Sequence, residues 1–208
     1  GENQAEYGNN VDDNYIPTMD TKFFSTQDPM EMVLGGKPVK DILKETKFTI
    51  NDFAPYIPPS ADYLRKKKVE VHYLGYYLPW DPQECYYYAV EHTGFSANPE
   101  RTPGTYSKYS SIDDKIDMFH YYTTLIKFGI GRATYDAAQE VRNDKITREE
   151  AVHLVKKYDH EFPEKFLGAF LEYINTTKEE FKTTVDRFRS PHLWKKNGNE
   201  WELKHTVD

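Results

Sequence analysis

One stretch of the chain decides how its second half is organised: KFGIGRATYDAAQEVR, residues 127–142. Its apolar residues recur at steps of three and four, which places them on one narrow buried face of a helix: Ile130, Ala133, Ala137 and Val141. Its charged residues stand four apart and form a ladder beside that face: Arg132, Asp136 and Glu140. Spacing alone therefore predicts a packed helix with an ion-pair face.

Two glycines, Gly129 and Gly131, open this stretch. Because a glycine inside a helix costs roughly 1 kcal/mol relative to alanine, their presence needs a reason. Three interpretations stay open: the helix begins there, it kinks there, or the glycines let another backbone or a ligand come close.

Composition narrows the class of protein. The chain has 208 residues, enough for one large domain or two small ones, and a net charge of −7. This charge argues against a nucleic-acid binder whose affinity rests on phosphate neutralisation, although residues 65–68 form a short basic run. The single Cys85 excludes an internal disulfide and a zinc site with paired cysteines.

Hydropathy gives no sign of a membrane protein. No apolar run approaches the roughly 20 residues needed to span a bilayer, and no signal-peptide pattern is present. We expect a soluble cytoplasmic protein without membrane or nucleic-acid partners. The 17 Tyr and 12 Phe are typical of chains that line polar pockets or interfaces.

The first half of the chain suggests little regular structure. The pattern predicts short helices at 30–34, ending at Gly35-Gly36, and at 39–43. The β-branched and aromatic residues of 69–78 predict a strand. Asp81 is then expected as the N-cap, and Pro82 as the first residue, of a helix that Gly94 ends.

Trp80 and Asp81 follow the predicted strand and precede a helix. In open α/β sheets ligands bind at such strand-to-helix loops, so both residues are candidates for a binding site. An N-cap beside a packed tryptophan explains them equally well.

The second half is predicted to be helical apart from a loop at 95–110. Ser111 and Asp114 resemble a capping box at the start of the next helix. Further helices, two of them with capping boxes, and a terminal hairpin follow at 146–158, 166–174, 177–189 and 193–204. We expect two domains, 1–142 and 143–208.

Standard catalytic motifs are missing. The pattern at 129–134 lacks the third glycine of a dinucleotide fingerprint, and no strand precedes it. A calcium loop ending at Glu150 would place Asp144 where glycine is required. The seven His show no metal-ligand spacing, so no metal site is predicted. Residue patterns alone therefore leave the catalytic residues unknown.

Several longer segments, in order, resemble the N-acetyl sugar amidotransferase family, whose members belong to the PP-loop ATP pyrophosphatase superfamily. These segments are 1–8, 77–81, 104–117, 127–134, 146–151 and 190–194. The resemblance implies an enzyme of bacterial surface-polysaccharide synthesis that converts an acetamido group of a nucleotide-linked sugar to an acetamidino group. ATP, with Mg²⁺, would activate the amide oxygen as an adenylate, and ammonia from a glutaminase partner would displace AMP.

The resemblance covers the C-terminal part of such an enzyme. The family's paired-Cys segments and its Ser-Gly-Gly-x-Asp-Ser pyrophosphate loop do not occur in this sequence. The implied fold is mainly α with a few strands: the C-terminal part of an α/β PP-loop fold, with strands at 1–8 and 69–78, plus a small helical module and a terminal β-hairpin. By itself the chain is expected to be inactive.

The resemblance also suggests roles for individual residues. Glu2, Asn3 and Glu6 would face the nucleotide, its metal or the sugar. Phosphate, sugar hydroxyls or Mg²⁺ would be held by a further group: Lys108, Asp113 and Asp114. Arg132 would contact phosphate while Asp136 orients its guanidinium. The alternatives are a charge pair at a helix N-terminus for Asp113 and Asp114, and a helix ion pair for Arg132 and Asp136.

Two other functions remain compatible with the sequence. A PP-loop enzyme of another branch, such as tRNA thiolation, would need a basic RNA-binding face, which the net charge of −7 disfavours. A helical module at 146–189 that docks the glutaminase partner is the non-enzymatic alternative.

Overall fold

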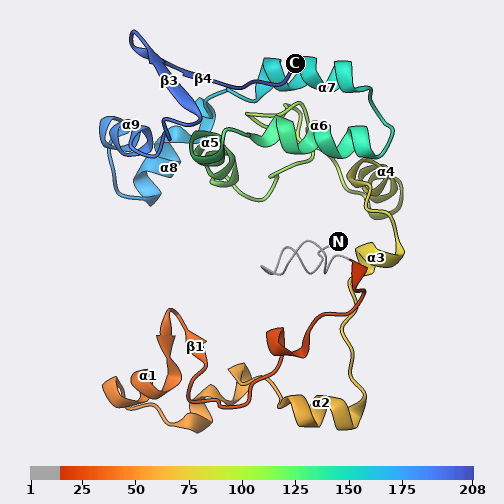
Figure 1. Cartoon of the computed structure of the whole chain (residues 1–208), viewed down its shortest axis with the longest axis vertical. Helices are drawn as coiled ribbons and strands as arrows, with labels where there is room; N and C mark the ends of the chain where they lie inside the picture. Colours follow the sequence, from red (N-terminus) through yellow and green to blue (C-terminus); the bar gives the residue numbers. More distant parts are fainter. Residues whose placement is uncertain (1–14) are drawn as a thin grey trace. The chain divides into compact units, whose positions relative to one another are not determined.

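The computed structural model describes residues 15–208, which divide after Trp80 into two compact units, 15–80 and 81–208 (Figure 1). Both units are mainly helical. Within residues 15–208 the only sheets are two small antiparallel hairpins, so the predicted content of mainly α with a few strands is confirmed. The predicted boundary after residue 142 falls inside the second unit. The predicted strand at 1–8 lies outside the described residues.

The first unit is made of short elements: η3 (Thr21–Phe23), β1 (Val33–Leu34), β2 (Lys37–Pro38), α1 (Val39–Glu45), η4 (Ile50–Tyr56), α2 (Ala61–Lys67) and α3 (Leu74–Tyr77). Few of its described apolar side chains are buried, namely Val39, Phe53, Leu64 and Tyr73. The predicted helix at 39–43 is confirmed as α1.

The predicted helix at 30–34 is wrong, because Val33 and Leu34 form strand β1, which pairs with β2 in a hairpin. Gly35 and Gly36 both have positive φ, 55° and 83°. A two-residue turn with both φ values positive is the one whose twist matches a hairpin. The glycines therefore reverse the chain instead of ending a helix.

The predicted strand at 69–78 is also wrong. His72 makes a single bridge to Thr18, and residues 74–77 form α3. A strand needs a ladder of partners, and Thr18 alone does not supply one. Tyr73 is buried, whereas Tyr76 and Tyr77 are about half exposed, so the aromatic run does not pack as one face of a sheet.

The second unit holds α4 (Pro82–Thr93), α5 (Asp117–Phe128), α6 (Arg132–Arg142), α7 (Arg148–Tyr158), η5 (Glu164–Phe166), α8 (Leu167–Tyr173), α9 (Lys178–Asp186), β3 (Trp194–Asn197) and β4 (Glu200–Leu203). The sequence predicted the first residues of most of these helices. Asp81 caps α4 with Pro82 in its first turn, and capping boxes open α7 and α9. The hairpin β3–β4 turns at Gly198, as expected.

The predicted start of α5 at Ser111 is wrong, because the helix begins at Asp117. Ser111 has a left-handed φ of 54°, and its hydroxyl donates to Asp117 instead of capping a helix. Asp114 accepts from the Ile116 backbone N–H at 2.6 Å. Both side chains thus stabilise a turn that leads into α5.

The core of this unit forms where α5 meets α8 and α9. Phe119 stacks on Phe170 with ring centroids 4.0 Å apart, and Phe181 meets both rings edge-on. The Trp194 indole N–H donates to the Ile126 carbonyl at 2.7 Å, which fastens the terminal hairpin to α5. This core gives α5, and the loop before it, a fixed base.

Candidate functional site

The loop between α4 and α5 is held by buried hydroxyl groups. Its buried polar residues are Thr102, Thr105, Ser107 and Ser110. The Thr102 hydroxyl donates to the Ser110 carbonyl at 2.6 Å, and the Thr102 N–H donates to the Ser107 carbonyl at 2.9 Å. Since buried polar groups need partners, these bonds fix one loop conformation.

Arg101 ties this loop to the segment after α7. Its guanidinium makes a two-pronged ion pair with Glu161, at 2.6 and 2.7 Å, and lies over the Tyr158 ring. Glu161 also accepts from the Gly104 N–H at 2.8 Å. These hydrogen bonds, with that from Arg101 foremost, lower the pKa of Glu161.

The start of α6 is held by Asp159, which is buried after α7. Its carboxylate accepts from the Gly131 N–H, the Thr134 N–H and the Thr134 hydroxyl, each at 2.9 Å. It satisfies N–H groups that the first turn of a helix leaves without partners. A Cβ at Gly131 would lie 2.8 Å from an Asp159 carboxylate oxygen, so glycine permits this close approach.

Arg132 lies in a partly buried cluster between α5 and α6. Its Nε donates to Asp136 at 3.0 Å, Nη1 lies 3.6 Å from Asp117, and the guanidinium stacks on the Tyr121 ring at 4.3 Å. Asp136 also accepts from the Thr105 hydroxyl at 2.5 Å. The cluster therefore fastens α6 to α5 and to the loop.

Several acidic and phenolic groups near this cluster have raised pKa values. Burial raises the pKa of Asp136, although Arg132 and Thr105 oppose the effect. Burial, and then the charges of Glu140 and Asp136, raise the pKa of Tyr106. Burial likewise raises the pKa of Tyr109 to about 12. Perturbed groups gather at functional sites but also in structural networks.

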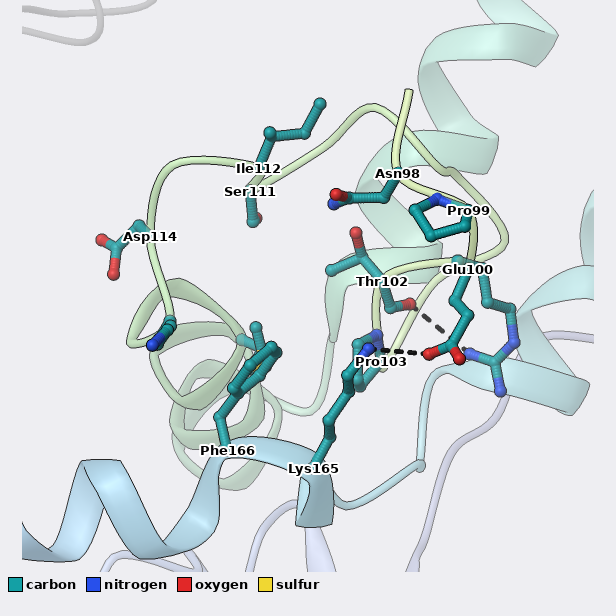
Figure 2. A pocket seen from close by; sticks show the side chains of 13 residues that line it. Asn98, Pro99, Glu100, Thr102, Pro103, Ser111, Ile112, Asp114, Lys165 and Phe166 are labelled. Atoms are coloured by element: carbon teal, nitrogen blue, oxygen red, sulfur yellow. Dashed lines mark hydrogen bonds and ion pairs between the residues drawn. The ribbon is translucent and has the colours of Figure 1, made fainter. Parts of the chain in front are cut away.

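A cavity of about 260 Å³ lies beside this loop (Figure 2). The 95–116 loop, the first turn of α5 and η5 enclose it. Its lining mixes polar, charged and apolar side chains: Asn98, Pro99, Glu100, Arg101, Thr102, Pro103, Ser111, Ile112, Asp114, Lys115, Met118, Lys165 and Phe166. Figure 2 shows Asn98 and Phe166 on opposite sides of the open space, with the Lys165–Glu100 ion pair at one edge.

The structure brings some of the predicted site residues together and separates others. Arg132 and Asp136 form the expected helix ion pair, and Asp114 lines the cavity. Lys108 is exposed and donates to the Pro99 carbonyl, and Asp113 is exposed as well.

The remaining predicted residues have other positions. Asp81 caps α4 through the Gln83 and Glu84 N–H groups and pairs with Lys145 at 3.4 Å. Trp80 ends the first unit and is about half exposed. The segment before it is not a strand, so the predicted strand-to-helix position of Trp80 and Asp81 is wrong. Glu2, Asn3 and Glu6 lie outside the described residues.

Comparison with known families gives the decisive observation. A family model described as "LPS biosynthesis protein WbpG-like, C-terminal domain" matches residues 103–207, which is half of the chain. The chain belongs to this family. No curated protein matches the sequence. The WbpG-like domain takes in most of the polar loop and every element from α5 to β4, all within the second unit (Figure 1).

Sequence reasoning missed several residues on which the WbpG-like domain depends: Arg101, Gly104, Thr105, Asp117, Asp159 and Glu161. The density of hydroxyls at 102–111 was a usable signal of an ordered loop. The partners of Arg101 and Gly131 lie 60 and 28 residues away. No local pattern predicts such pairs.

Proposed function

We propose that this chain is the C-terminal part of an ATP-dependent amidotransferase of lipopolysaccharide biosynthesis. The reaction would replace the amide oxygen of an acetamido group, on a nucleotide-linked sugar, by nitrogen from ammonia. The observation that carries the proposal is the match to the WbpG-like LPS biosynthesis family over residues 103–207. The matched range includes the segments at 104–117, 127–134, 146–151 and 190–194 on which the amidotransferase resemblance rests.

The described residues offer neither a metal-binding cluster nor an unoccupied arginine at the predicted phosphate contact. Within residues 15–208 no group of three His, Cys, Asp or Glu side chains could hold a metal ion. The Arg132 guanidinium is occupied by Asp117 and Asp136 and stacked on Tyr121, so a phosphate would have to displace these carboxylates. We therefore assign the described part of the chain to sugar binding and support, and nucleotide activation to other parts of the enzyme.

The proposed partner is a glutaminase that supplies ammonia. In the complete enzyme, ammonium salts should then support turnover without the partner, whereas glutamine should support it only when the partner is present. Turnover from glutamine by the enzyme alone would contradict the need for a separate glutaminase.

The complete enzyme tests the reaction itself. Incubated with ATP, ammonium and a nucleotide-linked acetamido sugar, it should release AMP and form a product in which mass spectrometry finds NH in place of the amide oxygen. Reactions lacking ATP or ammonium are the controls. A well-folded enzyme that leaves a panel of such sugars unchanged would refute the proposal.

A further inference from the structure

The cavity beside the 95–116 loop has the lining of a site for a small polar ligand. Asn98, Ser111 and Thr102 bring amide and hydroxyl groups to it, while Phe166, Met118 and Ile112 add apolar surface. Within residues 15–208 the Asn98 side-chain amide makes no hydrogen bond, and in Figure 2 it points into the open space opposite the Phe166 ring. A ring-shaped ligand could therefore lie on Phe166 and bond to Asn98.

This lining is fixed before any ligand arrives. Thr102 is bonded to Ser110, and Arg101 to Glu161, on one side of the cavity. On the other side, Met118 is buried in the core and Phe166 packs against it. Ser111 has a left-handed φ of 54°, an uncommon conformation for a residue with a side chain. A preorganised lining lowers the entropic cost of binding.

The size and charge of the cavity restrict the ligand. Its volume of about 260 Å³ is below the range of about 300–1,000 Å³ typical of drug-sized ligands, which favours one sugar ring over a whole nucleotide sugar. Of the three cations in its lining, Arg101 and Lys165 are already paired, with Glu161 and Glu100. Lys115 remains as a single cation without an ion pair among the described residues, which is little for the several negative charges of a diphosphate.

The geometry points to this cavity as the binding site for the acetamido-bearing ring of the sugar substrate. The inference rests on the proposed function for the identity of the sugar. The Phe166 ring packs against one face of the pyranose, and the Asn98 amide bonds to the acetamido group or a neighbouring hydroxyl. The exposed Lys165–Glu100 pair, 2.7 Å apart, borders the cavity and is weak enough to open as the sugar enters.

Saturation-transfer NMR on the 208-residue chain tests this site, with N-acetylglucosamine, glucose and uridine diphosphate as probes. We expect N-acetylglucosamine to bind and glucose to bind more weakly. Asn98→Ala should weaken N-acetylglucosamine binding about fivefold, the loss expected for one hydrogen bond. Phe166→Leu keeps an apolar side chain in the core and should also weaken binding, because the aromatic face is lost.

The matched control is Phe188→Leu, which changes an exposed phenylalanine that does not line the cavity and should leave sugar binding unchanged. Circular dichroism of each variant verifies folding. The inference is overturned if N-acetylglucosamine does not bind, if both cavity variants bind it like the unmodified chain, or if uridine diphosphate displaces it.

Assays of the complete enzyme separate this inference from the proposed function. A raised KM for the sugar in Asn98→Ala supports the cavity as the substrate site. Amidine formation with an unchanged KM in both cavity variants overturns the cavity while leaving the proposed function intact. Sugar binding that depends on Asn98 and Phe166, in an enzyme that forms no amidine, supports the cavity and refutes the proposed function.

Discussion

Asp159 accepts hydrogen bonds from residues 25 and 28 positions earlier in the chain and thereby joins the end of α7 to the start of α6. Its carboxylate is buried, so removing it would take a side-chain acceptor from the N–H groups of Gly131 and Thr134. A buried donor left without a partner costs more than the hydrogen bond itself contributed.

Asp159→Ala should lower the free energy of unfolding by about 3 kcal/mol, since the buried Gly131 N–H and the partly buried Thr134 N–H and hydroxyl lose this acceptor. Urea denaturation followed by circular dichroism measures the loss. Asp113→Ala, at an exposed carboxylate, is the control and should change stability by less than about 0.5 kcal/mol. Equal effects of the two substitutions would contradict the role given to Asp159.

Two glycines should respond to alanine with opposite signs. A Cβ at Gly131 would lie 2.8 Å from a carboxylate oxygen and 2.9 Å from the backbone oxygen of Asp159, so Gly131→Ala should destabilise the protein by about 1–3 kcal/mol. Gly168 lies within α8 and has open space around it. Gly168→Ala should stabilise the protein by about 0.4–1 kcal/mol. Thermal melts of both variants decide this, and a stabilising Gly131→Ala would refute the close approach.

Asp136 should make stability fall as the pH rises. Burial raises its pKa in the folded state above the ordinary value of 3.8, so the folded protein favours the protonated carboxyl. The stability that this provides is complete below pH 3.8 and is lost as the pH rises through the raised pKa. The asparagine of the Asp136→Asn variant cannot ionise. The unfolding free energy of this variant should therefore rise relative to that of the unmodified protein as the pH increases from 3.8 through the raised pKa.

Urea melts of both proteins at a series of pH values measure the difference between their unfolding free energies. The other carboxylates are common to both proteins, so their contributions cancel in this difference. Thr183→Ala, at an exposed residue that carries no titratable group, serves as the control, and its difference from the unmodified protein should not change with pH. A difference that is constant with pH, or that favours aspartate as the pH rises, would mean that Arg132 and Thr105 outweigh burial.

Helix starts in this protein are set by local capping chemistry. In α7 and α9 the threonine hydroxyl accepts from the third helical N–H while the glutamate at that position accepts from the threonine N–H. In α4 the Asp81 carboxylate accepts hydrogen bonds from the N–H groups of Gln83 and Glu84. The donor and the acceptor of each capping hydrogen bond lie within four residues of each other, so the sequence alone predicts where these helices begin.

Thr177→Ala should lower the unfolding free energy by about 1 kcal/mol, the usual cost of removing an N-cap side chain. Thr183, in the exposed interior of the same helix, provides the matched control. Thr183→Ala should be neutral or slightly stabilising, because alanine has the higher helix propensity. Chemical denaturation of both variants tests the pair, and equal losses would show that the cap contributes nothing specific.

The two units differ in how much core each contains. The second unit holds the stacked phenylalanines of α5, α8 and α9 together with Trp194. In the described part of the first unit, the buried apolar side chains are Val39, Phe53, Leu64 and Tyr73. Stability should therefore be concentrated in the second unit.

None of the helices within residues 15–208 combines the length and the apolar character that a membrane span requires.

Residues 81–208 alone should fold and unfold cooperatively. Their melting temperature should lie within a few degrees of the main transition of the 208-residue chain, because the principal core lies within this unit. Near-ultraviolet circular dichroism of Trp194 and Trp201 reports on packing in both proteins. A fragment without a cooperative transition would show that the first unit is needed for this core.

The sequence by itself determined those features that depend on neighbours along the chain. The starts of α4, α7 and α9, the terminal hairpin and the Arg132–Asp136 pair follow from capping, turn and i,i+4 rules. Three local interpretations were wrong, at 30–34, at 69–78 and at the start of α5. At the first two, glycine and aromatic patterns fit more than one backbone until strand partners are known.

Only the tertiary structure decided what the two glycines do and where a ligand could bind. Gly129 ends α5 with a φ of 78°, and Gly131 lets Asp159 approach the start of α6. The cavity combines Asn98 and Ser111 with Phe166, which the sequence separates by more than 50 positions. Such contacts form only when the core of α5, α8 and α9 brings distant segments together. Rules of residue spacing act over a few positions and cannot predict contacts between residues so far apart in the sequence.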